Sequence, residues 1–325
     1  MSTGNQRSRF PWAAKRTGWW RIENLGLYLV TLVIFVLLSF ASRYFLTPSN
    51  LFDVLRQSTF VLIIALGSTF VIMTGGIDLS VGAILGLSAG VTSVILLQTG
   101  GSTILAVAGG LLAGLLCGLV NGLLITRLRV TDFISTLATL SVFRGILYMM
   151  TEGVPFAKFA NPTFSFLGRG MLGPIPFPVI ITIAVFLLLS HLLNQMKFGR
   201  HVLATGSNRE AARLSGVQTD QIKLRVYMIS GVCCALAGIL LGSRLSSVPP
   251  DLGQGYELSA IAAVVIGGTA LSGGRGSLSG TVLGAVMIAM ISNGLILLNV
   301  NPFYQFVING VLIVIAVALN RSRQA

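Results

Sequence analysis

Apolar residues run in ten stretches along nearly the whole chain, each bounded by Gly, Pro, Asn or charged residues. The stretches are residues 25–42, 51–72, 79–98, 102–126, 133–150, 177–194, 224–242, 257–272, 277–298 and 303–319. A helix of about 20 apolar residues crosses the roughly 30 Å hydrocarbon core of a bilayer. The pattern therefore predicts an all-α polytopic membrane protein with about ten transmembrane helices.

The basic residues predict the orientation of these helices. If both termini are cytoplasmic, 16 of the 22 Lys and Arg residues fall on the cytoplasmic side. They lie within 7–21, at Arg127 and Arg129, between Lys197 and Arg225, and at Arg275, Arg321 and Arg323. Cytoplasmic loops are enriched in Lys and Arg. We therefore expect cytoplasmic tails at 1–24 and 320–325, and a membrane domain at 25–319 with a cytoplasmic loop at 195–223.

Composition agrees with a lipid environment, because 54% of the residues are hydrophobic and only 10% are charged. A soluble fold of this size needs far more polar surface. The net charge of +13 would indicate a nucleic-acid partner in a soluble protein. Here the orientation rule accounts for it, and we expect no nucleic-acid partner.

Glycines recur at four-residue spacing in two of the stretches. Gly82, Gly86 and Gly90 share one helical face, as do Gly110, Gly114, Gly118 and Gly122. Small residues at this spacing let helix backbones approach closely within a membrane. We expect these faces to pack against other helices of the same chain.

One pattern occurs twice. Gly75, Gly76, Gly82, Leu85 and Gly86 have the same spacing as Gly273, Gly274, Gly280, Leu283 and Gly284. Transporters commonly consist of two related halves with broken helices. The repeat predicts two weakly related halves, with a backbone break where each glycine pair interrupts a span.

The basic loop contains a short predicted helix. Ser207 and Glu210 have the spacing of a capping box, and Gly216 follows about two turns later as a stop signal. We expect this helix on the cytoplasmic face, with Ala211, Ala212 and Leu214 docking into a partner. A connector lying on lipid headgroups explains the same residues equally well.

Three segments resemble one known family. They are Gly75-Gly-Ile-Asp-Leu-Ser-Val-Gly82, Gly206-Ser-Asn-Arg-Glu-Ala-Ala-Arg-Leu-Ser-Gly216 and Gly255-Tyr-Glu-Leu-Ser-Ala-Ile-Ala-Ala-Val-Val-Ile-Gly-Gly-Thr-Ala-Leu-Ser-Gly-Gly-Arg-Gly276. With Asn293-Gly-Leu and a closing apolar span, they are similar to the ribose-type permeases of bacterial ATP-binding-cassette sugar importers. The resemblance implies a ten-helix inner-membrane permease surrounded by lipid and paired with a second copy or a paralogue. It also implies a cytoplasmic ATPase that uses ATP and Mg, a periplasmic sugar-binding protein, and no cofactor bound by this chain.

The resemblance also assigns roles to residues. Those implied for an ATPase-coupling helix are Gly206, Ser207, Asn208, Glu210, Ala211, Ala212, Ser215 and Gly216. Those in signature segments near a gate or pathway are Gly75, Gly76, Asp78, Gly273, Gly274 and Gly276.

Further polar residues lie within or beside the predicted spans. Asn121, Asn293, Gln305 and Asn309 would either hydrogen-bond sugar hydroxyls or tie helices together. Asp78 directly precedes a span, and we expect it to cap that helix. Arg144 is about 9 Å from the outer end of its span, and we expect it to snorkel to the interface.

Two other functional classes fit the sequence less well. An ion-driven secondary transporter normally has carboxylates inside its spans, whereas the acids nearest the membrane, Asp53, Asp78 and Glu257, fall near predicted span ends. An intramembrane hydrolase needs clustered catalytic groups, but Gly86-Leu-Ser-Ala-Gly90 lies in a glycine-spaced helix far from His191 and His201. We therefore expect a non-enzymatic permease subunit for a monosaccharide, with the secondary transporter as the alternative.

Overall fold

The computed structural model describes residues 25–156 and 161–301, and a few positions between 303 and 314. These residues form twelve helices and one short pair of strands. The helices are α1 (Leu25–Ala41), α2 (Pro48–Met73), α3 (Val81–Gln98), α4 (Thr103–Thr126), α5 (Asp132–Thr151), α6 (Pro162–Arg169), α7 (Phe177–Asn194), α8 (Lys197–Ser207), α9 (Arg209–Leu214), α10 (Thr219–Leu245), α11 (Tyr256–Ile266) and α12 (Leu278–Leu297). Strand β1 (Met171–Leu172) pairs antiparallel with β2 (Ile175–Pro176), with Met171 opposite Pro176.

Seven helices are long and apolar enough to cross a membrane: α2, α3, α4, α5, α7, α10 and α12. Helix α1 is similarly apolar, with 17 residues. The prediction of a polytopic helical membrane protein is therefore confirmed. The predicted tails at 1–24 and 320–325 lie outside the described residues, as does most of the predicted span 303–319. The count of ten spans and the cytoplasmic position of the termini stay predictions.

One predicted span, 257–272, is wrong. Helix α11 has only 11 residues, so it is about 16 Å long and covers about half of the hydrocarbon core. The rest of the predicted span is a non-helical segment that runs from Gly267 to the start of α12. A helix buried among other helices needs only apolar residues, and its sequence therefore resembles that of a complete span.

Helix α10 lies at the centre of the bundle and packs against α2, α3 and α4. The α4 glycines form the contact with it: a Cβ at Gly114 would collide with the Gly231 carbonyl of α10, and one at Gly118 would collide with the Tyr227 carbonyl. The expected role of this glycine face in packing within the chain is confirmed. Helices α4, α5 and α7 are apolar, and only 28% of the most apolar window of each is buried, as expected for helices that face lipid or a partner.

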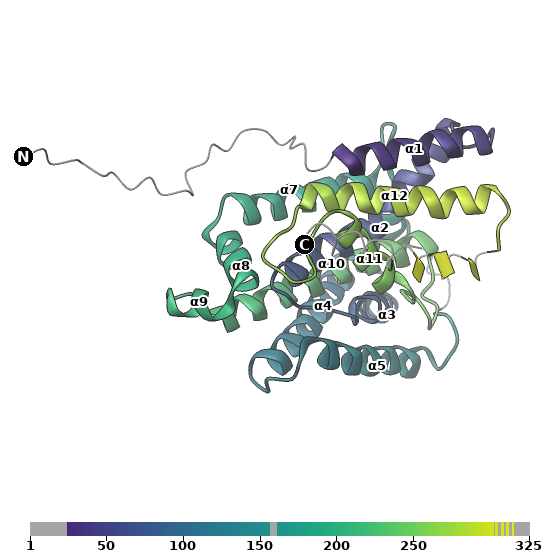
Figure 1. Ribbon diagram of the computed structural model, residues 1–325. Helices are drawn as coiled ribbons and strands as arrows, with labels where there is room; N and C mark the ends of the chain where they lie inside the picture. Colours follow the sequence, from purple (N-terminus) through teal and green to yellow (C-terminus); the bar gives the residue numbers. More distant parts are fainter. Residues whose placement is uncertain are drawn as a thin grey trace, which may run out of the picture.

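The connections gather at two ends of the bundle. Figure 1 shows α1, α5 and α12 running roughly parallel, with α8 and α9 beside one end. We call this the α9 end, and it also contains the turns 74–80, 127–131 and 267–277. The opposite end contains residues 42–47, 99–102, 152–156 and 161–176, including α6 and the two strands.

The segment after α10, residues 246–255, turns back into the bundle. It begins at the opposite end, where the Phe156 N–H donates to the Val248 carbonyl over 3.1 Å. It then descends alongside α3, with the Leu252 carbonyl against Gly86 and Gly253 against Gly82. Helix α11 therefore begins inside the bundle and runs toward the α9 end. We call residues 246–255 the re-entrant segment.

Candidate functional site at the α9 end

Helix α9 is capped at both ends by residues of its own sequence. The Asn208 side-chain oxygen accepts a hydrogen bond from the Ala211 N–H at 2.9 Å, which makes Asn208 the N-cap. Gly216 has φ +84° and ends the helix, with the Gly216 N–H donating to Arg213 O and the Val217 N–H to Ala212 O. These two bonds form a Schellman motif. The predicted stop at Gly216 is confirmed.

The predicted cap at Ser207 is wrong. Ser207 is the last residue of α8, a helix that the sequence analysis did not predict. Ser and Asn are both good N-cap residues, and because α8 continues through Ser207, the cap moves one residue along the chain. Glu210 is consequently too close to the cap to complete a capping box and lies exposed.

The exposed face of α9 differs from the predicted docking face. Leu214 is 86% exposed and Ala211 is exposed, but Ala212 is buried at 5%. The Ser215 hydroxyl donates to the Ala211 carbonyl at 2.9 Å and is itself exposed. Ala212 therefore anchors the helix to its own chain, while Leu214 is a free apolar side chain at the α9 end.

A groove of about 540 Å³ lies beside α9. Its walls come from the end of α4, the turn into α5, α9 and the start of α10. Its lining residues include Arg129, Asp132, Arg209, Glu210, Arg213 and Asp220. Charges of both signs around an open groove suit a polar peptide segment better than a small apolar ligand. Among the residues that the structure describes, no group of His, Cys, Asp and Glu could hold a metal ion.

The end of α8 lies between the two repeated glycine turns. A Cβ at Gly206 would collide with the Met73 carbonyl and approach the Gly274 nitrogen, and the Gly274 N–H donates to that carbonyl at 2.9 Å. A Cβ at Gly273 would lie 2.8 Å from the Gly75 nitrogen. The two glycine pairs therefore meet each other and α8. They lie in turns between helices, so the expectation that they interrupt spans is wrong.

Further contacts connect α8 and the second glycine turn to α2. The rings of Phe198 in α8 and Phe70 in α2 stack with centroids 6.2 Å apart. A Cβ at Gly276 would lie 2.5 Å from the Met73 side chain. Because packed interiors deform little, we treat α8 and the two turns as one mechanical unit.

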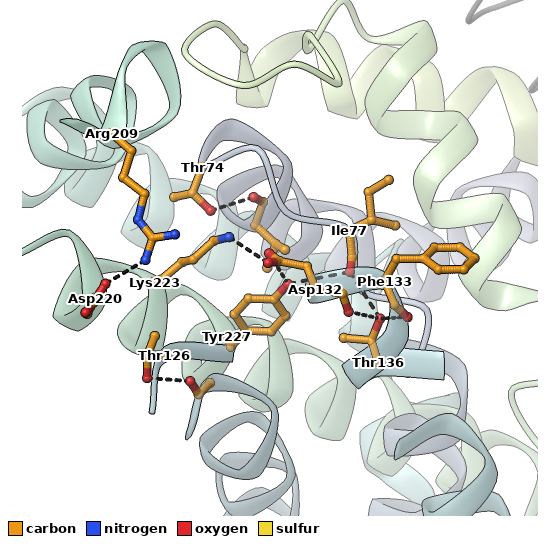
Figure 2. Close-up of polar contacts among 12 residues, drawn as sticks. Thr74, Ile77, Thr126, Asp132, Phe133, Thr136, Arg209, Asp220, Lys223 and Tyr227 are labelled. Carbon is orange, nitrogen blue, oxygen red and sulfur yellow. Dashed lines mark hydrogen bonds and ion pairs between the residues drawn. The ribbon is translucent and has the colours of Figure 1, made fainter. Parts of the chain in front are cut away.

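A buried ion pair crosses the same end of the bundle. The Lys223 ammonium in α10 contacts Asp132 Oδ1 at 2.7 Å, and the Tyr227 hydroxyl donates to Asp132 Oδ2 at 2.9 Å. Thr136 donates to the Ile77 carbonyl at 3.1 Å. Figure 2 shows this cluster together with the exposed Arg209–Asp220 pair nearby. The cluster joins α5, α10 and the turn before α3.

Sequence reasoning missed Asp132, Lys223 and Tyr227. Lys223 and Tyr227 are four residues apart and share a helical face, which was a detectable signal. Their partner Asp132 is 91 residues away from Lys223, and no local pattern connects them.

Asp78 is buried in a second polar network. Its Oδ1 accepts from the Ser80 N–H at 2.9 Å and from the Ser80 hydroxyl at 2.6 Å, immediately before α3. The Asn121 amide donates to the Ser80 hydroxyl at 2.8 Å and accepts from the Thr139 hydroxyl at 2.6 Å. The expectation that Asp78 caps α3 is wrong, because Ser80 is the N-cap and Asp78 instead holds the turn before it. Asn121 ties this turn, α4 and α5 together.

Asn293 is also occupied by contacts within the chain. Its amide donates to Asn50 Oδ1 at 2.8 Å, and the Asn50 amide donates to Asn293 Oδ1 at 3.1 Å. This reciprocal pair joins α12 to the first turn of α2. Gln305 and Asn309 lie outside the described residues. For Asn121 and Asn293, the structure favours the helix-tying interpretation over a pathway role.

Two predictions about charges inside the bundle are wrong. The Arg144 guanidinium does not snorkel outward, because its Nη1 donates to the Leu252 carbonyl of the re-entrant segment at 2.6 Å. Glu257 lies in the first turn of α11, as predicted, but this helix is not a complete span, so Glu257 lies inside the bundle beside Gly82 of α3 rather than at a membrane surface. Both errors follow from treating 257–272 as a complete span.

Comparisons with known proteins identify the family. Residues 50–317 match the family model described as branched-chain amino acid transport system / permease component. The chain is 44% identical over 305 residues to the ribose import permease protein RbsC of Bacillus subtilis, covering 94% of both chains. It is 38% identical over 294 residues to the D-allose transport system permease protein AlsC of Escherichia coli, covering 90% of both.

A third relative extends this range of sugars. The L-arabinose ABC transporter permease protein AraH of Azospirillum brasilense is 37% identical over 313 residues, which cover 96% of this chain and 92% of that protein. No solved structure gives a significant match. Since the family model and each relative cover most of the chain, the chain belongs to the family of branched-chain amino acid transport system permease components.

Proposed function

We propose that this chain is the membrane-spanning subunit of an ATP-driven importer that carries a monosaccharide, a ribose-like pentose or a related sugar. The full-length similarity to three permeases named for ribose, allose and arabinose carries this proposal. The chain is a multi-pass protein of the bacterial inner membrane and is not an enzyme. ATP hydrolysis takes place on a separate ATPase subunit, which uses ATP and Mg.

The α9 end presents an exposed leucine beside an open, charged groove. We propose that α9 docks onto the ATPase. Leu214 would enter an apolar pocket of the ATPase, and the charged groove would receive a polar segment of the ATPase. The exposed Leu214 and the open groove support this proposal. On this proposal the α9 end is cytoplasmic, and a periplasmic sugar-binding protein delivers the sugar at the opposite end. A second copy or a paralogue would complete the membrane channel.

Uptake into proteoliposomes tests the proposal. The permease is reconstituted with its cognate ATPase and binding protein, and radiolabelled ribose, allose and arabinose are supplied separately. We expect uptake of at least one sugar that requires ATP and all three proteins and persists after ionophores collapse the ion gradients. Gradient-driven uptake by this chain alone would establish a secondary transporter instead.

The docking surface has its own test. Leu214→Asp should weaken association of the ATPase at least tenfold in a pull-down titration, because it places a charge in an apolar contact. The melting temperature of the Leu214→Asp permease should equal that of the wild type, since Leu214 is 86% exposed. Val154→Asp is the matched control, because Val154 is 64% exposed at the opposite end. Equal association of both variants with the ATPase would exclude α9 as the contact.

A further inference from the structure

The re-entrant segment brings charged residues into the interior of the bundle. Arg144 lies twelve residues after the start of α5 and seven before its end, about 18 Å and 10 Å from the two ends. Glu257 follows the re-entrant segment directly and lies beside the first turn of α3. Charged side chains at such depth are rare and face the interior of a bundle or a water-filled cavity.

Arg144 and Glu257 do not form an ion pair with each other. Within the described part of the chain, no carboxylate oxygen lies within 4 Å of the Arg144 guanidinium. Arg144 donates one hydrogen bond to the Leu252 carbonyl. Glu257 Oε1 accepts from the Gly255 N–H at 3.1 Å, but its buried Oε2 has no partner in the structure. Donor and acceptor capacity therefore remains at this depth.

The surroundings of this pair are polar. Asp251 and Gln254, both in the non-helical re-entrant segment, are exposed. On the adjacent side of α5, Ser141 is exposed and Tyr148 is 45% exposed. Non-helical backbone at membrane depth occurs only where it is buried in protein or lines water. Exposed polar side chains on such a segment therefore indicate a water-filled space beside them.

We propose that Asp251, Gln254 and Glu257, together with Ser141, Arg144 and Tyr148, line the passage of the transported sugar, and that Arg144 and Glu257 hydrogen-bond its hydroxyl groups. This inference rests on the proposed function. A sugar hydroxyl both donates and accepts, a guanidinium only donates, and a carboxylate only accepts. The two side chains are therefore complementary to a polyol. Since water satisfies the same groups in the absence of sugar, binding here is weak and release is fast.

Glu257→Gln tests this role without removing the contact to Gly255, because the amide oxygen still accepts from that N–H. In the reconstituted system we expect at least a tenfold loss of sugar uptake, with ATPase activity stimulated by the binding protein remaining within about twofold of the wild type. Glu152→Gln is the matched control, because Glu152 is an exposed carboxylate that immediately follows α5. Its uptake should equal that of the wild type.

Thiol labelling tests the passage independently of transport. Ser141→Cys should react with a membrane-impermeant, positively charged methanethiosulfonate, and the transported sugar should slow that reaction. Leu116→Cys, on the apolar exposed face of α4, is the control and should stay unlabelled. The native cysteines are buried in the bundle and contribute little background.

Three results would overturn the inference. Wild-type uptake by Glu257→Gln would remove that residue from the passage. No labelling at position 141 would place this side of α5 against lipid or protein. Dissociation of two permease copies by Glu257→Gln, seen by size-exclusion chromatography, would identify a contact between copies. If the wild type shows no ATP-dependent uptake, the proposed function fails, and labelling at position 141 still decides whether a water-filled passage is present.

Discussion

The buried Asp132–Lys223 pair gives the sharpest test of how the α9 end is held together. Lys223→Met keeps the length and apolar stem of the side chain but removes its charge. The Asp132 carboxylate then remains largely buried, at 16% side-chain exposure, with the Tyr227 hydroxyl as its remaining partner. Removing one partner of a buried ion pair costs about 3–5 kcal/mol. We take about 3 kcal/mol, since Asp132 retains some solvent contact.

The second variant separates the charge from the packing. In the double variant Lys223→Met, Asp132→Asn no uncompensated charge remains, and Tyr227 can still donate to the Asn side-chain oxygen. Replacing both members of a buried pair by neutral groups is often close to neutral in stability. We therefore expect the double variant to regain about 2 of the lost 3 kcal/mol of unfolding free energy.

Thermal unfolding in detergent measures both effects. A thiol-reactive fluorescent dye reports unfolding, because Cys117, Cys233 and Cys234 are buried in the native bundle. With about 2 °C per kcal/mol for a chain of this size, Lys223→Met should melt about 6 °C lower and the double variant within about 2 °C of the wild type.

Arg209→Met is the matched control for this measurement. It breaks an exposed pair at the same end of the bundle, with side-chain exposures of 50% and 54%. Exposed pairs contribute about 0–1 kcal/mol, so its melting temperature should shift by about 2 °C or less. The role of the buried pair is wrong if Lys223→Met has the same melting temperature as Arg209→Met. It is also wrong if the loss of stability in the double variant equals the sum of the losses in the two single variants.

Two further predictions use the same melting measurement. Gly206→Ala should lower stability by about 1–3 kcal/mol and reduce ATP-driven uptake, because the new Cβ collides with the Met73 carbonyl. Gly145→Ala, with nothing within 4 Å of its added Cβ, should raise stability by up to about 1 kcal/mol and leave uptake unchanged. Asn293→Leu should cost about 1–3 kcal/mol by leaving the buried Asn50 amide without that partner. The Asn50→Leu, Asn293→Leu double variant should lose less than the two single variants together; strict additivity would show that the reciprocal pair is not coupled.

Local patterns predicted the parts of the fold that depend on neighbouring residues. The four-residue glycine spacing of α4 correctly predicted its packing, because that spacing defines one helical face whatever the partner. Gly216 correctly predicted the end of α9, because a residue with positive φ is needed there. In both cases the physical requirement involves only residues within one or two helical turns.

The parts that could not be predicted depend on the environment around a segment. An apolar sequence such as that of α11 suits a helix covered by lipid and one covered by protein equally well. The sequence therefore did not show that α11 is only about half as long as a complete span. Ser207 and Asn208 are equally good caps, and the extension of α8 decided between them. Asp132 and Lys223 meet only because α5 and α10 pack together. The sequence therefore located the short helix that ends at Gly216. It did not reveal the burial of Ala212 or the contact between Asp132 and Lys223.

Contacts at the α9 end lead to the helices that lie beside the re-entrant segment. Gly206 at the end of α8 lies against Met73, the last residue of α2, and both Gly206 and Ser207 lie against Gly274 in the turn before α12. The Asp132–Lys223 pair joins the first turn of α5 to α10. Helix α3 carries Gly82, against which Glu257 lies, and α5 carries Arg144.

Helices are stiff over these lengths, and the contacts between them are closely packed. We infer that a displacement of α9 moves the N-terminal ends of α3 and α5 together, and with them the two sides of the proposed passage. An ATPase that contacts only the α9 end can therefore change the distance between Arg144 and Glu257 without touching either residue. Under the proposed function, this arrangement links ATP hydrolysis outside the membrane to release of the sugar from the proposed passage.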